Sequence, residues 1–356
     1  MEEAMIKACI VGAGGYGGCG ATEILSRHPE VEIVALIDKE NIGMKISEIY
    51  PHLNGFCDLP IISADSKEVE DIEADVVFFA TPDRVGQREA SKWLQKGAKV
   101  IDYSGDFRFN SLDIYCGYAE RIGAEKSHAC PELLREAVYG LPELHRSEIA
   151  NARVVGNPGC FAVSCILGLA PLVKADLIKP ETVICDAKTG VSGAGKKPNP
   201  MFHYPARYDS MNAYKIASHQ HVYEIEKELS DLSEKDVKIT FTPHVVPMCR
   251  GILSTIYADP TDKVDIKEVM EAYRDFYKKE RFVRVFDPGT ILQTAHVRGT
   301  NFCNISPNID KRTGKIIIIS VIDNLVKGQA GNAVQNMNIM FGLDEALGLN
   351  IPGMYP

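Results

Sequence analysis

The chain has 356 residues, about twice the length of an ordinary domain, so two domains are expected. Hydrophobic residues make up 45% of it and charged residues 24%, a balance that excludes a disordered chain, a coiled coil and a collagen-like repeat. The net charge is −9, from 39 Lys and Arg against 48 Asp and Glu, so the composition does not favour a partner such as DNA or RNA.

The cysteines and the apolar runs indicate the cellular compartment and the redox state of the thiols. The ten cysteines include no C-x-x-C pair, so neither a zinc ribbon nor a redox motif is indicated, and no metal site is expected. Met1–Ala4 lead directly into a strand pattern, without the basic and apolar regions of a secretory leader. Apolar runs such as 76–80 and 316–319 are too short to cross a membrane. We therefore expect a cytoplasmic protein without membrane contact and with reduced thiols.

The first third of the chain alternates short apolar runs with helical patterns. Such alternation is typical of a parallel, doubly wound α/β sheet. We therefore expect a Rossmann-type dinucleotide-binding domain, formed by residues 1–156 and 328–356. The predicted strands are Lys7–Val11, Val31–Ile37, Asp75–Ala80 and Lys99–Asp102, and the predicted helices are Cys19–Arg27, Gln87–Lys96 and Gly328–Phe341.

Beyond about residue 155 the pattern changes to strands separated by turns. This grouping predicts a mixed sheet with helices on one face, an α+β domain of residues 157–327 that we assign to catalysis and oligomerisation. The predicted strands are Thr182–Asp186, Val237–Thr242, Gly251–Tyr257 and Lys315–Val321, with helices near Cys160–Leu169 and Asp265–Lys279.

A glycine-rich loop follows the first predicted strand and opens the first helix. It contains the pattern G-x-x-G-x-x-G, which lets the backbone approach a pyrophosphate closely and holds the phosphate charge at a helix N-terminus. A glycine-rich turn without a ligand is the alternative, but the position between strand and helix favours dinucleotide binding. The predicted cofactor-binding residues of the loop are Gly12, Gly14, Gly15, Tyr16, Gly17 and Gly18.

Two charged residues at the end of the second strand concern the choice of cofactor. Asp38 lies 20 residues beyond Gly18. An acidic residue there typically accepts a hydrogen bond from the adenosine ribose 2′-hydroxyl, which favours NAD over NADP. Lys39 can instead reach a 2′-phosphate, and Asp38 can also be an exposed loop acid with nothing bound. Both residues are cofactor-binding candidates, and the sequence leaves NAD and NADP open.

Cys160 stands where a strand turns into an apolar helix. A cysteine at a helix N-terminus has its thiolate stabilised by the helix dipole, and the backbone N–H groups there can hold an oxyanion. Cysteine is also a common small buried residue, and Cys165, one turn further on, is expected to be one. Position alone leaves both interpretations of Cys160 open.

The densest group of His and Glu residues lies at Ser218–Glu226. In an extended stretch, His219 and His221 point to the same face, an arrangement that sometimes binds metal. A third ligand is not evident nearby, so one histidine acting as an acid/base is the better interpretation. The cluster alone does not identify which histidine acts.

Together these residues resemble the N-acetyl-γ-glutamyl-phosphate reductases of arginine biosynthesis, a family within the semialdehyde dehydrogenase group. The resemblance extends over almost the whole chain, and the motifs occur in the order found in the family. They are Gly12–Gly18, Asp102–Arg108, Tyr139–Leu144, Asn157–Cys160, Gly190–Lys196, His219–His221, Pro243–Gly251, Gly299–Cys303 and Val334–Asn338.

The resemblance implies a reaction in which NADPH reduces N-acetyl-γ-glutamyl phosphate to N-acetylglutamate 5-semialdehyde and phosphate. Cys160 matches the nucleophile of the family, whose thiolate forms a thioester that hydride then reduces. His219 matches the acid/base histidine, and Glu224 matches the glutamate that orients this region. A covalent thioester divides one difficult step into two easier ones, which is why a cysteine is needed.

The resemblance also implies binding residues and assembly. Arg108 resembles a phosphate-side arginine, whose guanidinium fits phosphate in bidentate geometry. We assign substrate binding to Asn157, His221 and Arg250 as well, and cofactor binding to Gly193 and Asn336. The family forms dimers or tetramers, so a homo-oligomer is expected.

Some positions depart from the family pattern. Gly20, Gln220 and Val222-Tyr223 replace the usual residues near the loop and the histidines, and Asp38-Lys39 replaces the usual Ser-Arg. These changes leave open a sister reductase acting on aspartyl phosphate or on a carrier-linked aminoadipyl phosphate. A non-catalytic dinucleotide-sensing protein is the alternative from another functional class. The presence of both Cys160 and His219 argues against it.

Overall fold

The structure, a computed structural model, describes residues 5–355. Met1–Ala4, which carry the prediction about a leader, and Pro356 lie outside them. The chain forms two compact units. One comprises the residues up to Pro158 together with Gln329–Ile351, and the other comprises Gly159–Gly328 and the residues from Pro352 on. Among the helices of the described residues, none is long and apolar enough to cross a membrane.

The first unit is built on a seven-stranded sheet in the order β3-β2-β1-β4-β5-β7-β6, and every pair of neighbours is parallel. The central strands are apolar and buried on both faces, as all-parallel sheets require; every residue of β4 is buried. The strands are β1 (Ile6–Val11), β2 (Val31–Asp38), β3 (Ile61–Ser63), β4 (Val76–Phe79), β5 (Lys99–Asp102), β6 (Val138–Tyr139) and β7 (Val154–Gly156).

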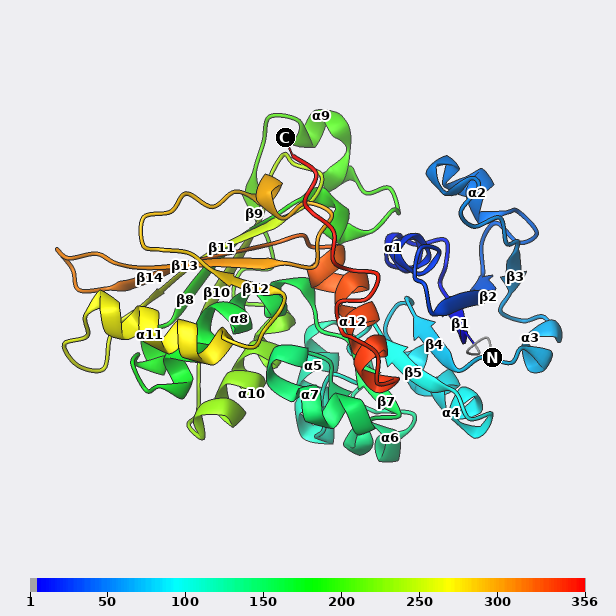
Figure 1. Cartoon of the computed structure of the whole chain (residues 1–356), viewed down its shortest axis with the longest axis horizontal. Coiled ribbons are helices and arrows are strands. Elements are labelled where there is room, and N and C mark those ends of the chain that lie inside the picture. Colours follow the sequence, from blue (N-terminus) through cyan, green and yellow to red (C-terminus); the bar gives the residue numbers. More distant parts are fainter. Residues whose placement is uncertain (1–4, 356) are drawn as a thin grey trace. The chain divides into compact units, whose positions relative to one another are not determined.

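The helices of this unit connect the parallel strands, and α12 returns from the far end of the chain to pack on α1 and α7 (Figure 1). The strand order reverses between β1 and β4, and ligands of such sheets bind beyond the carboxyl ends of the strands at this point. The predicted Rossmann-type sheet is confirmed. The helices are α1 (Tyr16–Leu25), α2 (Ile46–Ile49), α3 (Glu68–Asp71), α4 (Gly86–Gln95), α5 (Leu112–Arg121), α6 (Pro131–Glu136), α7 (Pro142–Asn151) and α12 (Gly331–Met340).

The second unit holds a mixed seven-stranded sheet in the order β12-β13-β14-β11-β8-β10-β9. Burial alternates along β11 and β8, so one face of the sheet is packed and the other is partly exposed. The mixed sheet is therefore also confirmed. Its strands are β8 (Ile184–Thr189), β9 (Asn212–Ala213), β10 (Thr240–Val245), β11 (Ile252–Ala258), β12 (Val283–Val285), β13 (Cys303–Ile309) and β14 (Ile316–Ile322).

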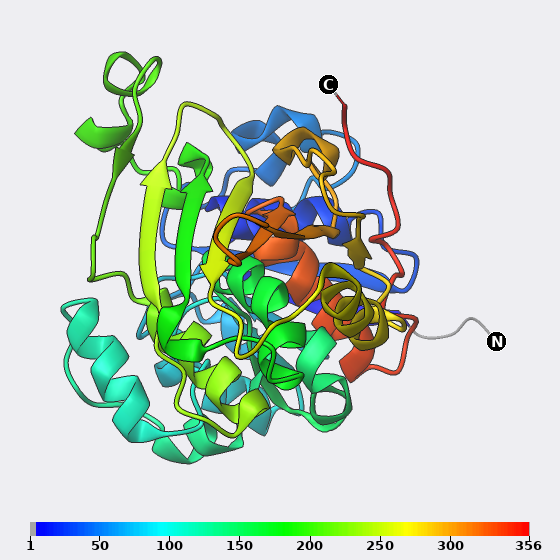
Figure 2. The same ribbon diagram turned by 90° about the vertical axis from the view of Figure 1, so that its left-hand side faces the viewer.

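Helices α8 (Cys160–Lys174) and α11 (Ile266–Tyr277) pack on this second sheet, and α10 (His221–Ser233) packs on α8 (Figure 1). Helix α8 is apolar around its whole circumference because α10, α11 and the sheet surround it. The short α9 (Tyr204–Arg207) belongs to a segment between β8 and β9 that extends away from the sheet (Figure 2). The buried Arg207 donates hydrogen bonds to the carbonyl oxygens of Met201 and Ser210 within this segment. It also donates to the carbonyl oxygen of Val245 in β10, which attaches the segment to the sheet.

Two local expectations need correction. The Ser218–Glu226 stretch is not extended, since α10 begins at His221. Ile225 and Leu229 lie one helical turn apart and are both buried. Burial of this apolar face stabilises the segment as a helix. The C-terminal helix pattern starts as a π-helical turn, Val326–Ala330, before α12 continues it. Such turns are rare and occur mostly at functional sites.

Candidate functional site

The glycine-rich loop lies at the strand-order reversal of the first unit, between β1 and α1. Gly12 has φ +84°, and a Cβ on it would stand 2.4 Å from the carbonyl oxygen of Ala80, which follows β4. A Cβ on Gly18 would stand 2.3 Å from the carbonyl oxygen of Gly12. Only glycine fits either place, so these residues make the tight cradle that close approach of a pyrophosphate requires.

Three polar side chains that the sequence analysis missed lie beside this loop or follow the adjacent strand. Gln329 and Tyr103 approach Gly17, where a Cβ would meet them at 3.0 and 3.3 Å, and Thr81 follows β4. The buried atoms Thr81 Oγ1, Tyr103 Oη and Gln329 Oε1 have no hydrogen-bond partner among residues 5–355. Buried polar atoms are rarely left unsatisfied, so the three atoms fit a polar ligand such as a dinucleotide.

Of these three residues, only Thr81 could have been found from the sequence. It directly follows a predicted strand next to the first one, where ligands of parallel sheets bind. Gln329 is distant in sequence from the loop, and only the return of the chain toward α12 brings it to Gly17.

Asn157 and Asn336, predicted to bind substrate and cofactor, are both fully buried in the first unit and bonded to each other. Asn157 Oδ1 accepts hydrogen bonds from Asn332 and Asn336, and its Nδ2 donates to the carbonyl oxygen of Gln329 at 3.0 Å. Arg108, 7% exposed, donates through Nε to the Asn157 carbonyl oxygen at 2.8 Å and through Nη2 to that of Tyr103. These contacts fix the backbone that leads from β7 toward Cys160.

Cys160 is the first residue of α8 in the second unit, and Gly159 is the N-cap. The Gly159 N–H donates to Glu224 Oε2 at 2.9 Å. The His221 ring lies against Gly159, since a Cβ there would stand 2.3 Å from His221 Nε2, and that nitrogen is 3.8 Å from Glu224 Oε1. The structure therefore brings His221 and Glu224 to the turn that carries Cys160, at a helix end where a thiolate is favoured.

Gly328, in the π-helical turn, lies close to Cys160. A Cβ on Gly328 would stand 2.7 Å from the Cβ of Cys160. Cys165, one turn along α8, is fully buried, and its Sγ is 3.9 Å from Ser254 Oγ. The two cysteines thus differ as the sequence predicts, one at the helix end and one in the core.

His219 is 4% exposed and sits in a cage of aromatic rings. Phe161, Tyr214 and Phe241 meet its ring edge-on, with centroids 5.3–5.7 Å away, and the His221 ring is 4.7 Å away. Burial, and then the nearby His221 and Lys215, lower the pKa of His219 to about 2. Its imidazole is therefore neutral in the resting protein.

A second glycine-rich loop, residues 190–195, and Arg250 both contact the residues just beyond β14, Asp323 and Asn324. Arg250 donates through Nε and Nη2 to the fully buried Asp323 carboxylate at 3.3 and 3.2 Å. Asn324 accepts from the Gly251 N–H at 2.7 Å and donates to Ser192 Oγ at 3.0 Å, next to Gly193. Asp323 and Asn324 therefore hold both loops.

Asp38 and Lys39 stand at the end of β2. The Gly14 N–H donates to Asp38 Oδ2 at 2.8 Å, so this carboxylate is directly attached to the glycine-rich loop. Tyr16 and Lys39 are exposed.

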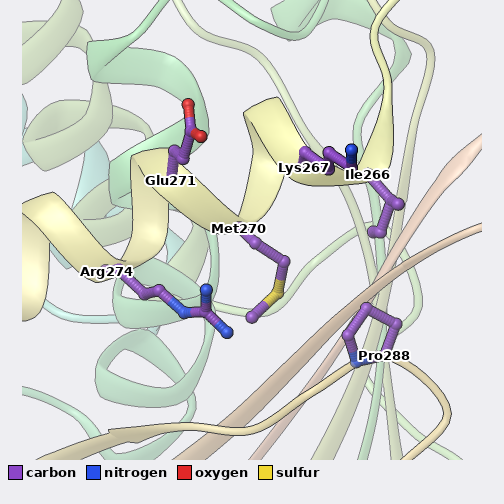
Figure 3. A pocket seen from close by; sticks show the side chains of 6 residues that line it. All are labelled: Ile266, Lys267, Met270, Glu271, Arg274 and Pro288. Atoms are coloured by element: carbon purple, nitrogen blue, oxygen red, sulfur yellow. The ribbon is translucent and has the colours of Figure 1, made fainter.

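The pocket shown in Figure 3 is lined by none of the residues predicted to bind substrate or cofactor or to act in catalysis. It has a volume of about 390 Å³ and lies beside α11, where Met270 extends toward Pro288 between the charged side chains. Arg274 is also paired with Asp287 at 3.0 Å.

Among residues 5–355, no group of three or more His, Cys, Asp or Glu side chains is arranged to hold a metal ion.

Comparison with known proteins assigns the two parts of the chain. Residues 7–152 match the family model "semialdehyde dehydrogenase, NAD binding domain", and residues 160–324 match "semialdehyde dehydrogenase, dimerisation domain". A protein of Geotalea daltonii named N-acetyl-γ-glutamyl-phosphate reductase is 46% identical over 353 residues, which are 99% of this chain and 100% of that protein.

Solved structures share the fold. Aspartate semialdehyde dehydrogenase II of Vibrio cholerae has a TM-score of 0.70 at 18% identity, covering 96% of this chain and 99% of that one. Aspartate semialdehyde dehydrogenase of Candida albicans, solved with NADP, has a TM-score of 0.70 at 16% identity, covering 95% and 98%.

Proposed function

The chain belongs to the N-acetyl-γ-glutamyl-phosphate reductase family of the semialdehyde dehydrogenases, and from this premise we propose that it reduces N-acetyl-γ-glutamyl phosphate to N-acetylglutamate 5-semialdehyde and phosphate. The observation that carries the proposal is Cys160 at the N-terminus of α8, on a turn bonded to Glu224 and packed against His221. The relatives of that name place this reaction in arginine biosynthesis.

Cys160 forms the covalent intermediate in this proposal. Its thiolate attacks the acyl carbon, the carbon–oxygen bond to phosphate breaks, and a thioester remains on Sγ. N–H groups at the start of α8 are positioned to stabilise the negative charge on the carbonyl oxygen during attack. Glu224 supports this geometry because it holds the Gly159 N–H immediately before the nucleophile. When the reduced adduct collapses, the aldehyde leaves and the thiolate is restored.

His219 is proposed as the acid/base, with His221 on the substrate side. Burial in the aromatic cage lowers the pKa of His219, so the resting imidazole is neutral and can accept a proton, but it is a weak base there. The same cage makes its protonated form costly, so a proton taken up there is readily returned to the oxygen of the hemithioacetal. His221 contacts both Gly159 and Glu224, which suits a residue that positions the acyl group. Arg108, Arg250 and Asn157 are proposed to order the surrounding loops around the anionic substrate.

The cofactor is proposed to be NADP, as in the family, and it supplies the hydride that reduces the thioester. The chain fits a dinucleotide at Gly12–Gly18, where Thr81, Tyr103 and Gln329 present buried polar atoms. Asn336 and Gly193 are proposed to complete the cofactor site, and the exposed Tyr16 and Lys39 to contact its outer part.

The test runs the reaction in reverse, following NADP⁺ reduction with N-acetylglutamate semialdehyde and inorganic phosphate. We expect a rate that depends on phosphate and greatly exceeds the rate with aspartate semialdehyde. Equal or faster turnover of aspartate semialdehyde would instead identify a sister reductase. Dinucleotide binding without any phosphate-dependent turnover would identify a sensing protein.

We also propose that the protein is a cytoplasmic homo-oligomer, assembled through the partly exposed face of the second sheet. Apolar residues gather there, with Ile184 42% exposed and Leu253, Tyr257, Ile317 and Ile319 half-buried. An apolar sheet face of this kind is typical of an interaction surface. Light scattering at increasing protein concentration should give at least twice the mass of one chain, and Tyr257→Asp should lower it.

A further inference from the structure

The carboxylate of Asp38 is held in one place at the end of β2. Its Oδ2 accepts a hydrogen bond from the Gly14 N–H at 2.8 Å, and its Oδ1 accepts from the N–H groups of Lys39 at 2.6 Å and Glu40 at 3.2 Å. Three backbone donors on two oxygens fix both the position and the orientation of the group, since hydrogen bonds to a carboxylate are the stronger kind. Asp38 is therefore not turned away from the glycine-rich loop.

The surrounding segments are fixed as well. The Gly14 carbonyl oxygen accepts from the Tyr50 hydroxyl at 2.8 Å, so this loop residue is bonded on both sides. The turn after Asp38 is closed by the Gly43 N–H, which donates to the Ile61 carbonyl oxygen at 2.9 Å. A rearrangement that moves Asp38 aside would break several of these bonds together.

This place is where the adenosine ribose of a dinucleotide lies, because β2 neighbours β1 and the glycine-rich loop in the sheet. A ribose 2′-hydroxyl can donate to a carboxylate oxygen, each of which has two lone pairs. A 2′-phosphate has no proton to donate at neutral pH and carries the same sign of charge as Asp38. Lys39 supplies one positive charge nearby, but Glu40 supplies another negative one.

We propose, on the basis of the function above, that Asp38 sets the cofactor preference of this protein by admitting NADH through the 2′-hydroxyl and opposing the 2′-phosphate of NADPH. The enzyme then uses both cofactors. Asp38 is a specificity-determining residue, and it acts through its fixed carboxylate.

The test compares wild type with Asp38→Ser and Asp38→Asn. The asparagine variant has nearly the same shape and keeps one acceptor oxygen, either for the Gly14 N–H or for the N–H groups of Lys39 and Glu40. Thermal unfolding of both variants checks that the fold is kept. Titration calorimetry with NAD⁺ and NADP⁺ gives the two dissociation constants without any turnover, and kcat/KM with NADH and NADPH gives the kinetic counterpart. Glu40→Gln is the matched control, because it removes the same charge two residues away but keeps the backbone bond to Asp38.

We expect both Asp38 variants to raise the NADPH-to-NADH ratio of kcat/KM, and the corresponding ratio of affinities, by about tenfold or more, since like charges in a binding site cost several kcal/mol. Glu40→Gln should shift either ratio much less. Unchanged ratios in both Asp38 variants, or an equal shift in Glu40→Gln, would overturn the proposal. If the protein binds dinucleotides but reduces no acyl phosphate, the proposed function fails while the calorimetric ratios still decide the role of Asp38.

Discussion

Replacement of Gly159 by alanine tests whether close packing of the His221 ring against Gly159 positions the turn that carries Cys160. The backbone of Gly159, φ −74° and ψ 144°, suits any residue, so the substitution introduces no backbone strain. The new Cβ would stand 2.3 Å from His221 Nε2 and 2.7 Å from both Cδ2 and Cε1. The Gly159 N–H remains able to donate to Glu224. The only direct change is therefore a steric one, directed at one ring.

The size of the effect follows from this overlap. Ordinary contacts lie at about 3.5 Å or more, so either the ring or the Cys160 turn must move by about 1 Å. Overpacking of this kind costs about 1–3 kcal/mol of stability, which leaves the protein folded. A displacement of about 1 Å near the reacting atoms can lower activity by about 10²-fold, and we expect kcat/KM to fall by that order.

The assay is kcat/KM in the phosphate-dependent reaction, with thermal unfolding measured on the same samples. Gly168→Ala is the matched control on the same helix. Its Cβ would meet the Cδ1 of Ile256 at 2.8 Å, the far end of a flexible side chain that can rotate aside. Alanine also favours the helix over glycine by about 0.5–1 kcal/mol, so this variant should keep both its activity and its fold.

The same substitution made in the His221→Asn variant tests whether the His221 ring causes the loss of activity. In His221→Asn the ring is gone, so adding Gly159→Ala should cost little further activity, and the two effects should not be additive. If Gly159→Ala alone stays within threefold of wild type, or if it is just as harmful without the ring, then contact with His221 does not position the Cys160 turn.

Three further results are expected. Cys160→Ala should abolish turnover and keep dinucleotide binding, whereas Cys165→Ala, in the core, should stay active; the reverse outcome would reassign the nucleophile. His219→Asn should lower kcat by about 10²–10⁴-fold, the range for lost acid–base catalysis, while His221→Asn acts chiefly on KM or stability, and equal losses in kcat would contradict the assignment. Burial, and then the neighbouring Asp106, raise the pKa of Asp102 well above its usual value, so the folded protein retains a proton that the unfolded chain loses above about pH 4. The stability from Asp102 is therefore complete at low pH and declines as pH rises, and Asp102→Asn should flatten the decline in Tm above about pH 4; a parallel decline in both proteins would refute this assignment.

Local patterns were sufficient to predict the elements that carry the chemistry. The strand–loop–helix order around Gly12–Gly18 and the strand–turn–helix order around Cys160 depend on glycine spacing and on apolar runs, which act within about ten to twenty residues. The two sheet classes followed from the same periodicities, and both are confirmed. The helix beginning at His221 was missed, although Val222, Ile225 and Leu229 recur at helical spacing and mark the face that packs against α8.

The sequence by itself determined the reaction class, because its ordered motifs resemble those of the N-acetyl-γ-glutamyl-phosphate reductases. Residue types and spacing alone left the roles of Cys160 and of the two histidines open. The tertiary structure decided how these groups are held. It brings Gln329 to the glycine-rich loop, joins Asn332 and Asn336 to Asn157, and places His221 against Gly159. These pairs come from distant parts of the chain or from helix packing. Such contacts depend on where buried apolar faces meet and not on local spacing, and for that reason only the folded chain reveals them.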